Sequence, residues 1–346
     1  MLLNGYTILS VFLCFVRLVL ALFVVVWGLS AWRLSRKTLS PDRASTVENR
    51  SYLLFLSSSV LIGLNVVSWP ILYLLLQSYV PEWPGVMCIY GVTKIGAGTI
   101  GASRFLPGLL DCLQCTKPLL VFLSGAGYVL YINNRRTRTG SILHRVVLLF
   151  LLTGGFSIID CVVETAYLTI PKTETRLAGG CCTGVLEAIR LESKFTPQSR
   201  VTASQRPYVS MAYILVNLAV IFGLLSRLDL FARPPTAKLN CLLYSCGLAS
   251  IPVSLLFLVE IAAPAILGLP FHHCPYDLIS AAPESIVAVI LFLSGCFSLG
   301  WSVIANTPGV SESTDEQPRK YGLLFCALFG YSGSLVLMSL ELYLAG

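Results

Sequence analysis

Long apolar runs alternate with short polar segments along the whole chain, and this pattern predicts helices that cross a membrane. A helix needs about 20 mainly apolar residues to span a hydrocarbon core about 30 Å thick. Runs of that length occur at residues 8–32, 52–79, 109–132, 146–170, 208–231, 241–268, 285–305 and 321–345. The pattern predicts an all-α polytopic membrane protein with about eight transmembrane helices. Because the first run ends in a basic segment instead of a small-residue cleavage site, we expect it to remain as a helix.

Composition agrees with a lipid environment and argues against nucleic acid as a partner. Hydrophobic residues make up 55% of the chain, charged residues only 12%, and the mean hydropathy is +0.78. Soluble domains carry about 25% charged residues. The net charge of +7 comes from basic residues clustered in short loops between apolar runs. Such clusters orient a membrane protein in the bilayer. We therefore interpret the positive charge as a sign of contact with lipid.

The basic residues also predict which loops face the cytoplasm. Fourteen Lys and Arg residues fall in one set of loops, at residues 33–51, 133–145, 226–239 and 306–320. Eight fall in the alternate set, at residues 80–108, 171–207 and 269–284. Because cytoplasmic loops are enriched in Lys and Arg, the first set is predicted to be cytoplasmic. Both termini are then extracytoplasmic, in a multi-pass protein of a plasma or inner membrane.

Short matching segments in the two halves predict an internal repeat. The residues from Pro84 to Tyr90 share the spacing Pro-x-x-x-Cys-x-Tyr with those from Pro270 to Tyr276. Further matches pair Phe122-Leu-Ser-Gly125 with Phe292-Leu-Ser-Gly295, Leu148-Leu-Phe150 with Leu323-Leu-Phe325, and Gly155-Phe-Ser with Gly330-Tyr-Ser. We therefore expect two tandem four-helix repeats, residues 1–170 and 208–346, joined by an extracytoplasmic segment, residues 171–207. Four helices per repeat give both repeats the same orientation in the membrane.

The repeated cysteine loops carry the candidate metal ligands. Parallel repeats place both loops on one side of the membrane, so that Cys88 and Cys274 can meet near the axis that relates the repeats. Thiolate, thioether and imidazole ligands together suit Cu(I) best and zinc next. The predicted ligand set is Met87, Cys88, His272, His273 and Cys274, with Tyr90 and Tyr276 as repeated neighbours. A metal donor or acceptor protein on the extracytoplasmic side is the partner that such a site would need.

Further cysteines on the predicted extracytoplasmic side suggest redox chemistry or additional ligands. Cys181 and Cys182 lie between glycines in the connecting segment, where they could bind a soft metal or close a strained disulfide. Cys112 and Cys115 are three residues apart and share a helix face, which suits a redox pair, two ligands or simple packing. Cysteines at 14, 241, 246, 296 and 326 are expected to pack as small apolar side chains.

Ionisable residues inside the predicted spans form the last group of candidates. Asp160, Cys161 and Glu164 fall in the fourth span, and Glu260 falls in the sixth. Charged groups at such depth are costly, so they are expected to face the bundle interior and to belong to a site or pathway. We expect Lys117 to pair with Asp111 in the third span. For Arg17 the sequence leaves two alternatives, a carboxylate partner or a side chain that reaches the membrane surface.

Several function classes lack the motifs that they require. The spans contain no histidine for haem b, and the chain contains no Cys-x-x-Cys-His, Walker, His-Glu-x-x-His or Gly-x-Ser-x-Gly motif. Gly96-Ala-Gly-Thr-Ile-Gly101 lacks the β-α-β context of a nucleotide site, and we interpret it as a re-entrant or interfacial turn.

Three hypotheses then remain. The first is an extracytoplasmic Cys/His/Met site that binds or transfers a thiophilic metal ion, copper first and zinc second. The second is a membrane thiol-disulfide oxidoreductase, which explains the cysteines but gives the histidines no role. The third is a non-catalytic accessory subunit of a larger membrane complex. The sequence does not decide whether the protein is an enzyme.

Overall fold

Helices account for almost all of the chain that the structure describes. The structure is a computed structural model, and it describes residues 4–35, 41–82, 89–93, 95–96, 101–137, 143–172, 204–228, 237–268, 274–305 and 317–345. In these ranges every regular element is a helix. Within them, eight helical spans are long and apolar enough to cross a membrane: Gly5–Arg33, Tyr52–Glu82, Ala102–Ile132, His144–Thr169, Arg206–Arg227, Leu239–Ile266, Glu284–Ala305 and Tyr321–Ala345. The predictions of an all-helical, multi-pass membrane protein and of eight spans are confirmed.

The positions of apolar side chains agree with a lipid environment. On the first span, the large side chains of Phe12 and Phe15 are 61% and 65% exposed. The buried face of the same helix carries small or polar side chains instead, such as Ala21 and Ser10. A soluble helix would show the opposite arrangement, with its large apolar side chains in the core. Lipid is therefore the medium that covers the outward face of this helix.

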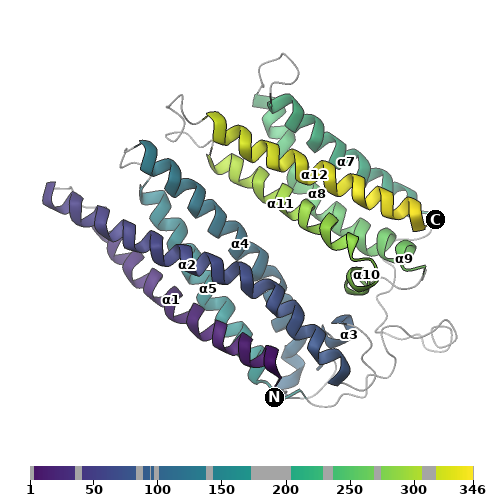
Figure 1. Cartoon of the computed structure of the whole chain (residues 1–346), viewed down its shortest axis with the longest axis horizontal. Coiled ribbons are helices and arrows are strands. Elements are labelled where there is room, and N and C mark those ends of the chain that lie inside the picture. The colour runs from purple at the N-terminus through teal and green to yellow at the C-terminus, as the bar shows by residue number, and fades with distance from the viewer. Residues whose placement is uncertain are drawn as a thin grey trace. The chain divides into compact units, whose positions relative to one another are not determined.

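Contacts divide the chain into two compact units. Unit 1 is built from four long helices and one short helix: α1 (Gly5–Ser35), α2 (Pro41–Tyr79), α3 (Ile89–Thr93), α4 (Leu106–Thr137) and α5 (Leu143–Thr169). Each long helix packs against two neighbours in the order α1, α2, α4, α5, and α5 closes the bundle against α1 (Figure 1). Two short 3-10 helices, η1 (Val80–Glu82) and η2 (Ala102–Phe105), lie in the connection that also contains α3.

The turn that ends near α4 depends on glycine. Gly96 has a φ of 90°, and a Cβ atom there would lie 2.1 Å from the carbonyl oxygen of Ser103. Gly101 has a φ of 101°. Both φ values belong to the region that L residues with side chains rarely adopt. This supports the prediction of a tight turn between the second and third spans, and it explains the glycines without a phosphate site.

Unit 2 has the same number of long helices, but its second span is interrupted. Its elements are α7 (Arg206–Arg227), α8 (Ala237–Phe257), η3 (Leu258–Ala262), α9 (Ala263–Ile266), α10 (Pro275–Ala281), α11 (Glu284–Ala305) and α12 (Gln317–Ala345). The segment η3 is a π-helix that continues α8 into α9. α7 packs on α8 and α12, and α11 packs on α12 and α8 (Figure 1).

Candidate functional site

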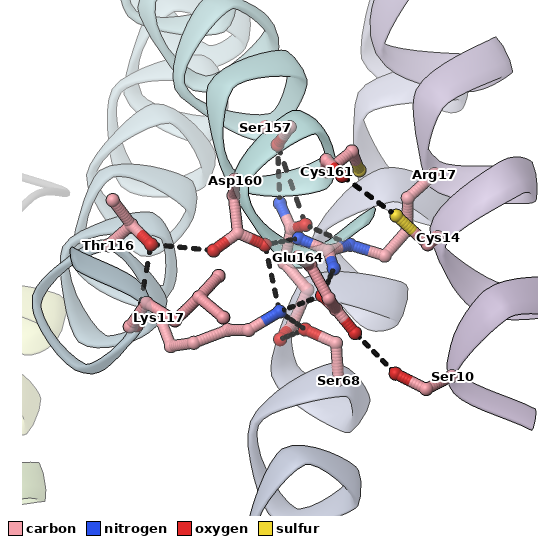
Figure 2. Close-up of polar contacts among 12 residues, drawn as sticks. Ser10, Cys14, Arg17, Ser68, Thr116, Lys117, Ser157, Asp160, Cys161 and Glu164 are labelled. Carbon is pink, nitrogen blue, oxygen red and sulfur yellow. Dashed lines mark hydrogen bonds and ion pairs between the residues drawn. The ribbon is translucent and has the colours of Figure 1, made fainter. Parts of the chain in front are cut away.

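A cluster of buried charged side chains lies inside unit 1. Arg17 comes from α1, Lys117 from α4, and Asp160 and Glu164 from successive turns of α5. The side chains of Arg17, Lys117 and Asp160 have no exposed surface, and that of Glu164 is 3% exposed. We call these four residues the ionic network. Figure 2 shows them converging between the helices.

Each cation of the ionic network contacts both carboxylates. Arg17 places Nη2 2.5 Å from Oδ2 of Asp160 and Nη1 3.2 Å from Oε2 of Glu164. Lys117 places Nζ 2.8 Å and 2.6 Å from the same two oxygens. Both carboxylates can contact the same cations because Asp160 and Glu164 are four residues apart and lie on one face of α5. Two positive and two negative groups give the network a net charge of zero.

Hydroxyl and amide groups complete the coordination of the carboxylates and the cations. Thr116 donates to Oδ1 of Asp160 at 2.6 Å, and Ser10 donates to Oε1 of Glu164 at 2.5 Å. The Nε atom of Arg17 donates to Oδ1 of Asn65 at 3.0 Å. Nζ of Lys117 also donates to Oγ of Ser68 at 3.4 Å, so that all three of its hydrogens have acceptors. All four carboxylate oxygens therefore accept hydrogen bonds, and α2 joins the other three helices around the network.

The ionic network extends from the middle of its spans toward one end, because Glu164 lies five residues before the end of His144–Thr169. Lys117 is the central residue of the span Ala102–Ile132, and Arg17 lies two residues from the centre of Gly5–Arg33. An ionised side chain at the centre of a bilayer is costly when it is alone. Removing one member of a buried ion pair costs about 3–5 kcal/mol, because the remaining charge has no partner. Each charged side chain of the network is therefore stabilised by its two partners of opposite charge.

A polar stripe connects the ionic network with the end of the bundle at which α1 begins. Asn4, Thr7, Ser10, Cys14 and Arg17 follow one another at spacings of three or four residues, which places them on one face of α1. Thr7, Ser10, Cys14 and Arg17 are all buried. Beyond Arg17 the same face is apolar. The polar stripe, as we call the residues from Asn4 to Arg17, thus ends at the middle of the membrane.

Hydrogen bonds tie the polar stripe to α2 and α5. Asn4 donates to Oγ of Ser78 at 2.7 Å, and the hydroxyls of Thr7 and Tyr79 lie 3.3 Å apart. Ser10 reaches Glu164, as described above. The thiol of Cys14 donates to the carbonyl oxygen of Cys161 at 3.2 Å. Hydrogen-bonding groups therefore occur along α1 from its first turn to the ionic network, and Figure 2 shows the contacts of Ser10 and Cys14 at the network end.

Beyond the network, α1 closes tightly against α5. Ala21 and Val24 have no exposed surface. A Cβ atom on Gly154 of α5 would lie 3.0 Å from Val25 and 3.2 Å from Val24, and one on Gly28 of α1 would lie 2.8 Å from Leu151. These contacts are apolar and close. The interior of unit 1 is therefore polar on one side of the network and apolar between α1 and α5 on the other.

A lysine lies just outside the fourth span, at the end of unit 1 where the polar stripe begins. Nζ of Lys172 lies 5.1 Å and 4.8 Å from the ring centroids of Tyr79 and Tyr167 and donates to the carbonyl oxygen of Tyr167 at 3.3 Å. Burial lowers the pKa of Lys172 to about 8, because it penalises the charged form. The two aromatic faces act in the opposite direction, since they attract the ammonium group.

The ion-pair prediction for the third span was wrong, and the predictions for the interior acids were correct. The side chain of Asp111 is exposed, and Lys117 pairs with Asp160 and Glu164 instead. Asp111 and Lys117 are six residues apart, so they lie on different faces of α4. Asp160, Glu164 and Glu260 do face the interior, with at most 3% exposure. Of the two alternatives for Arg17, the structure shows the carboxylate partner.

The predicted cysteine and histidine site falls mostly outside the described residues. This applies to Met87, Cys88, Cys181, Cys182, His272 and His273, and to the side chain of Tyr90. Cys274 is described: it is 2% exposed, and it immediately precedes α10. Tyr276 is half-buried in α10. Within the described part of the chain, no three His, Cys, Asp or Glu side chains are arranged to hold a metal ion.

The described cysteines are all free thiols with different surroundings. Cys112 is half-buried and Cys115 is exposed on α4, while Cys161 is buried beside Cys14. Cys296 packs with its Sγ 3.2 Å from the hydroxyl of Tyr331. Cys241 and Cys326 are exposed, so they differ from the buried packing that the sequence suggested. Exposure of these side chains on membrane helices is consistent with contact to lipid.

The ionic network was missed as a unit because its members are far apart in sequence. The pairs Arg17–Asp160 and Lys117–Asp160 are separated by 143 and 43 residues. The available signal was charge balance: two basic and two acidic residues lie within three of the spans. Comparisons of the chain with protein-family models, with curated proteins and with solved structures give no match. The function is therefore inferred from the geometry of the site itself.

Proposed function

We propose that this protein handles protons, and that the ionic network of unit 1 takes up and releases a proton inside the membrane. The observation that carries the proposal is the hydrogen bond from Ser10 to Glu164, which joins the polar stripe to the network. A buried ionisable group inside a membrane span marks a pathway or a site more often than it marks simple packing. Here, buried polar side chains on one face of α1 extend from the network toward the end of the bundle where that helix begins.

The proton path follows from the contacts in unit 1. A proton enters at the end of the bundle where Asn4, Thr7 and Tyr79 lie, and it reaches Glu164 through the hydroxyl of Ser10. A hydroxyl can accept a proton on one side and donate one on the other, so Ser10 exchanges one hydrogen for another. Protonation of Oε1 leaves Oε2 of Glu164 as a weaker acceptor for Lys117 and Arg17, whose bonds to Asp160 remain. The apolar contacts between α1 and α5 oppose transfer along α1 past the network.

Infrared difference spectroscopy after a pH jump tests this function. The full chain in lipid nanodiscs is expected to show a protonated-carboxyl band on acidification that disappears in Glu164→Gln. Ser10→Ala is expected to keep the amplitude of that band but to slow its appearance by about 100-fold, the lower end of the range known for positioned proton carriers. Ser30→Ala is the matched control, because Ser30 lies on the same helix, beyond the polar stripe, and donates to the carbonyl oxygen of Trp27.

Two results would contradict the proposal. One is the absence of any band that depends on Glu164, which would mean that the ionic network stays ionised and serves only to hold the helices together. The other is an unchanged rate in Ser10→Ala. The first result would favour the hypothesis of a non-catalytic accessory subunit, in which a saturated network specifies helix packing.

The duplication and the orientation belong to the same proposal. We infer that the two units are parallel repeats with extracytoplasmic termini, so that protons enter from the extracytoplasmic side. Support comes from the shared order of packed helices and from one further parallel. In each unit a short helix follows the repeated cysteine: α3 begins at Ile89, directly after Cys88, and α10 begins at Pro275, directly after Cys274. Labelling of single cysteines placed near each terminus in intact cells tests the orientation.

That parallel also supports a second function, binding of a thiophilic metal ion at the two cysteine loops. A cysteine kept directly before a short helix in both units is compatible with a thiol that serves a site, with His272, His273 and Met87 as neighbouring ligands for copper or zinc. Elemental analysis of the purified protein tests it. We expect bound metal that is lost in the double variant Cys88→Ser/Cys274→Ser, and metal-free wild-type protein would contradict it.

Thiol trapping in intact cells separates metal binding from thiol-disulfide exchange. Protection of Cys88 and Cys274 that a copper chelator removes supports the metal site. Protection that only a reductant removes supports an oxidoreductase in which these thiols pair and exchange electrons with Cys112 and Cys115 or with Cys181 and Cys182.

A further inference from the structure

A cavity in unit 2 brings together one acidic and one basic side chain outside the ionic network. The cavity has a volume of about 280 Å³ and is lined by Arg206, Pro207, Ser210, Glu260, Ile261, Pro264 and Ala265. Pockets for drug-sized ligands begin at about 300 Å³, so this one suits a small molecule or the head of a larger one. Arg206 is partly exposed and Pro207 is exposed, so the cavity reaches the surface of the unit.

The acidic wall is formed by the distorted part of the second span of unit 2. Glu260 is 3% exposed and lies within η3, the π-helix between α8 and α9. π-helical turns inside longer helices occur frequently at functional sites, because the extra residue turns a side chain out of the regular pattern. A buried carboxylate that lines a cavity favours a ligand group that carries positive charge and hydrogen-bond donors.

The basic wall is formed by the start of α7. Arg206 is the first residue of that helix, and its Nε atom is buried without a hydrogen-bond partner among the described residues. The first turn of a helix also presents free backbone N–H groups and a partial positive charge. The hydroxyl of Ser210, one turn further along, donates to the carbonyl oxygen of Arg206 at 3.3 Å, so the guanidinium group is the main donor of this wall. This wall therefore favours an anionic oxygen-bearing group.

The depth of the cavity agrees with the headgroup region of a bilayer. Arg206 is the first residue of the span Arg206–Arg227, and Glu260 lies six residues before the end of Leu239–Ile266. Six residues of helix correspond to roughly 9 Å. Ile261, Pro264 and Ala265 add apolar surface beside the two charged walls. The cavity thus combines both charges and apolar contacts near the level at which spans meet the membrane surface.

We propose that this cavity binds a zwitterion with a primary ammonium group and an anionic oxyacid group, and that its source is the headgroup of phosphatidylethanolamine. The ammonium group donates to Glu260, and the phosphate accepts from Arg206 and from the first turn of α7. A primary ammonium has three N–H donors, whereas the quaternary ammonium of choline has none, so ethanolamine is preferred over choline. A free amino acid has the same pair of charges and is the alternative source.

Thermal unfolding of the full chain in nanodiscs tests the site. Nanodiscs that contain phosphatidylethanolamine are expected to raise the unfolding temperature relative to phosphatidylcholine nanodiscs. Glu260→Gln and Arg206→Gln each remove a charge-assisted hydrogen bond, so each is expected to weaken binding by roughly ten- to a hundredfold and to abolish the difference. Arg227→Gln is the matched control, because Arg227 is in the last turn of the same helix.

A second variant keeps the test decisive if the loss of Glu260 prevents folding. Ala265 is exposed at the rim of the cavity, so Ala265→Leu fills space without removing a charge. It is expected to unfold at the wild-type temperature in phosphatidylcholine and to lose the response to phosphatidylethanolamine. Stabilisation by millimolar glycine or ethanolamine phosphate, with no response to the lipid, would assign the same site to a soluble zwitterion. Equal responses of wild-type protein and variants, or no response to any of these probes, would overturn the proposal.

Discussion

The two units hold their helices together in different ways. Unit 1 joins four helices through the ionic network, whose ion pairs connect residues of α1, α4 and α5. Unit 2 relies on close approach of helix backbones between α11 and α12. A Cβ atom on Gly330 would lie 2.6 Å from the carbonyl oxygen of Leu291 and 2.7 Å from Cα of Gly295. The polar contacts that Tyr331 makes near this interface, with Ser250 and Cys296, are between neutral groups.

This difference illustrates two ways to associate helices in lipid. Water does not drive transmembrane helices together, so packing of small residues and polar contacts between helices must do so. Unit 2 uses small residues where α11 and α12 approach each other. Unit 1 uses charges that depend on one another. The matching positions in the proposed repeat make the contrast specific: at the offset that pairs Gly155 with Gly330, Asp160 corresponds to Leu335 and Glu164 to Ser339.

The largest predicted effect is the loss of one charge from the ionic network. Asp160→Asn leaves Arg17 and Lys117 with one carboxylate between them, so the free energy of unfolding is expected to fall by about 3–5 kcal/mol. Denaturant-induced unfolding in detergent micelles measures it. Asp111→Asn on α4 is the control and is expected to change stability by less than about 0.5 kcal/mol, because Asp111 is exposed. Equal effects of the two variants would remove the distinction that we draw between the units.

A steric test addresses the glycine contact in unit 2. Gly330→Ala forces α11 and α12 apart, and it is expected to cost about 1–3 kcal/mol, the range for overpacking in a close interface. Gly155→Ala in unit 1 is the matched control, since no atom lies within 4 Å of a Cβ built there. That control is expected to be neutral or stabilising by up to about 1 kcal/mol. Destabilisation by Gly155→Ala alone would reverse the comparison.

A smaller effect is expected from the neutral polar contacts of unit 2. Tyr331→Phe removes the hydroxyl that lies 3.1 Å from Oγ of Ser250 and 3.2 Å from Sγ of Cys296. One neutral hydrogen bond contributes about 1 kcal/mol, so the loss should be well below that of Asp160→Asn. A double-mutant cycle with Ser250→Ala measures the contact itself. A coupling energy near zero would show that the hydroxyl contributes nothing to unit 2.

A further predicted effect is a change of stability with pH that comes from Lys172. Its pKa is lowered to about 8 in the folded protein and stands near 10.5 when unfolded. Between these values the unfolded chain binds more protons, so stability is expected to rise as the pH increases from 8 to 10.5. Below pH 8 both states are charged, and the full penalty of burying the charge remains. Unfolding of wild type and Lys172→Met across this pH range measures the effect, and parallel profiles would exclude it.

The sequence predicted the spans because each of them depends on local composition. All eight runs appear as helices, with ends that differ by a few residues from the expected ones. The largest difference is at the third span, which begins at Ala102 and not at 109, because η2 adds a polar turn that hydropathy does not register. The interior position of Asp160, Glu164 and Glu260 was also predictable, since exposure of a charged side chain to lipid is costly.

Pairing in the interior was less predictable, because it depends on helix rotation and on contacts between distant residues. Lys117 was assigned to the nearest acid in sequence, Asp111, although six residues of helix separate their directions by more than a right angle. Nothing in the sequence near Arg17 identifies Asp160 as its partner. The π-helix at Glu260 was also not predicted, although Pro264, four residues further on, has no N–H to bond the carbonyl of Glu260 in a regular helix.

The separation between Arg17 and its partners has a consequence for biosynthesis. Asp160 follows Arg17 by 143 residues, so it leaves the ribosome 143 residues later. At about 5–20 residues per second, this delay lasts roughly 7–30 s. An unpaired arginine at the centre of an inserted helix costs about 2.5–3.5 kcal/mol on the insertion scale. During that interval the first helix carries Arg17 without its carboxylate partners. This is the period in which a chaperone or the insertion machinery would bind the helix.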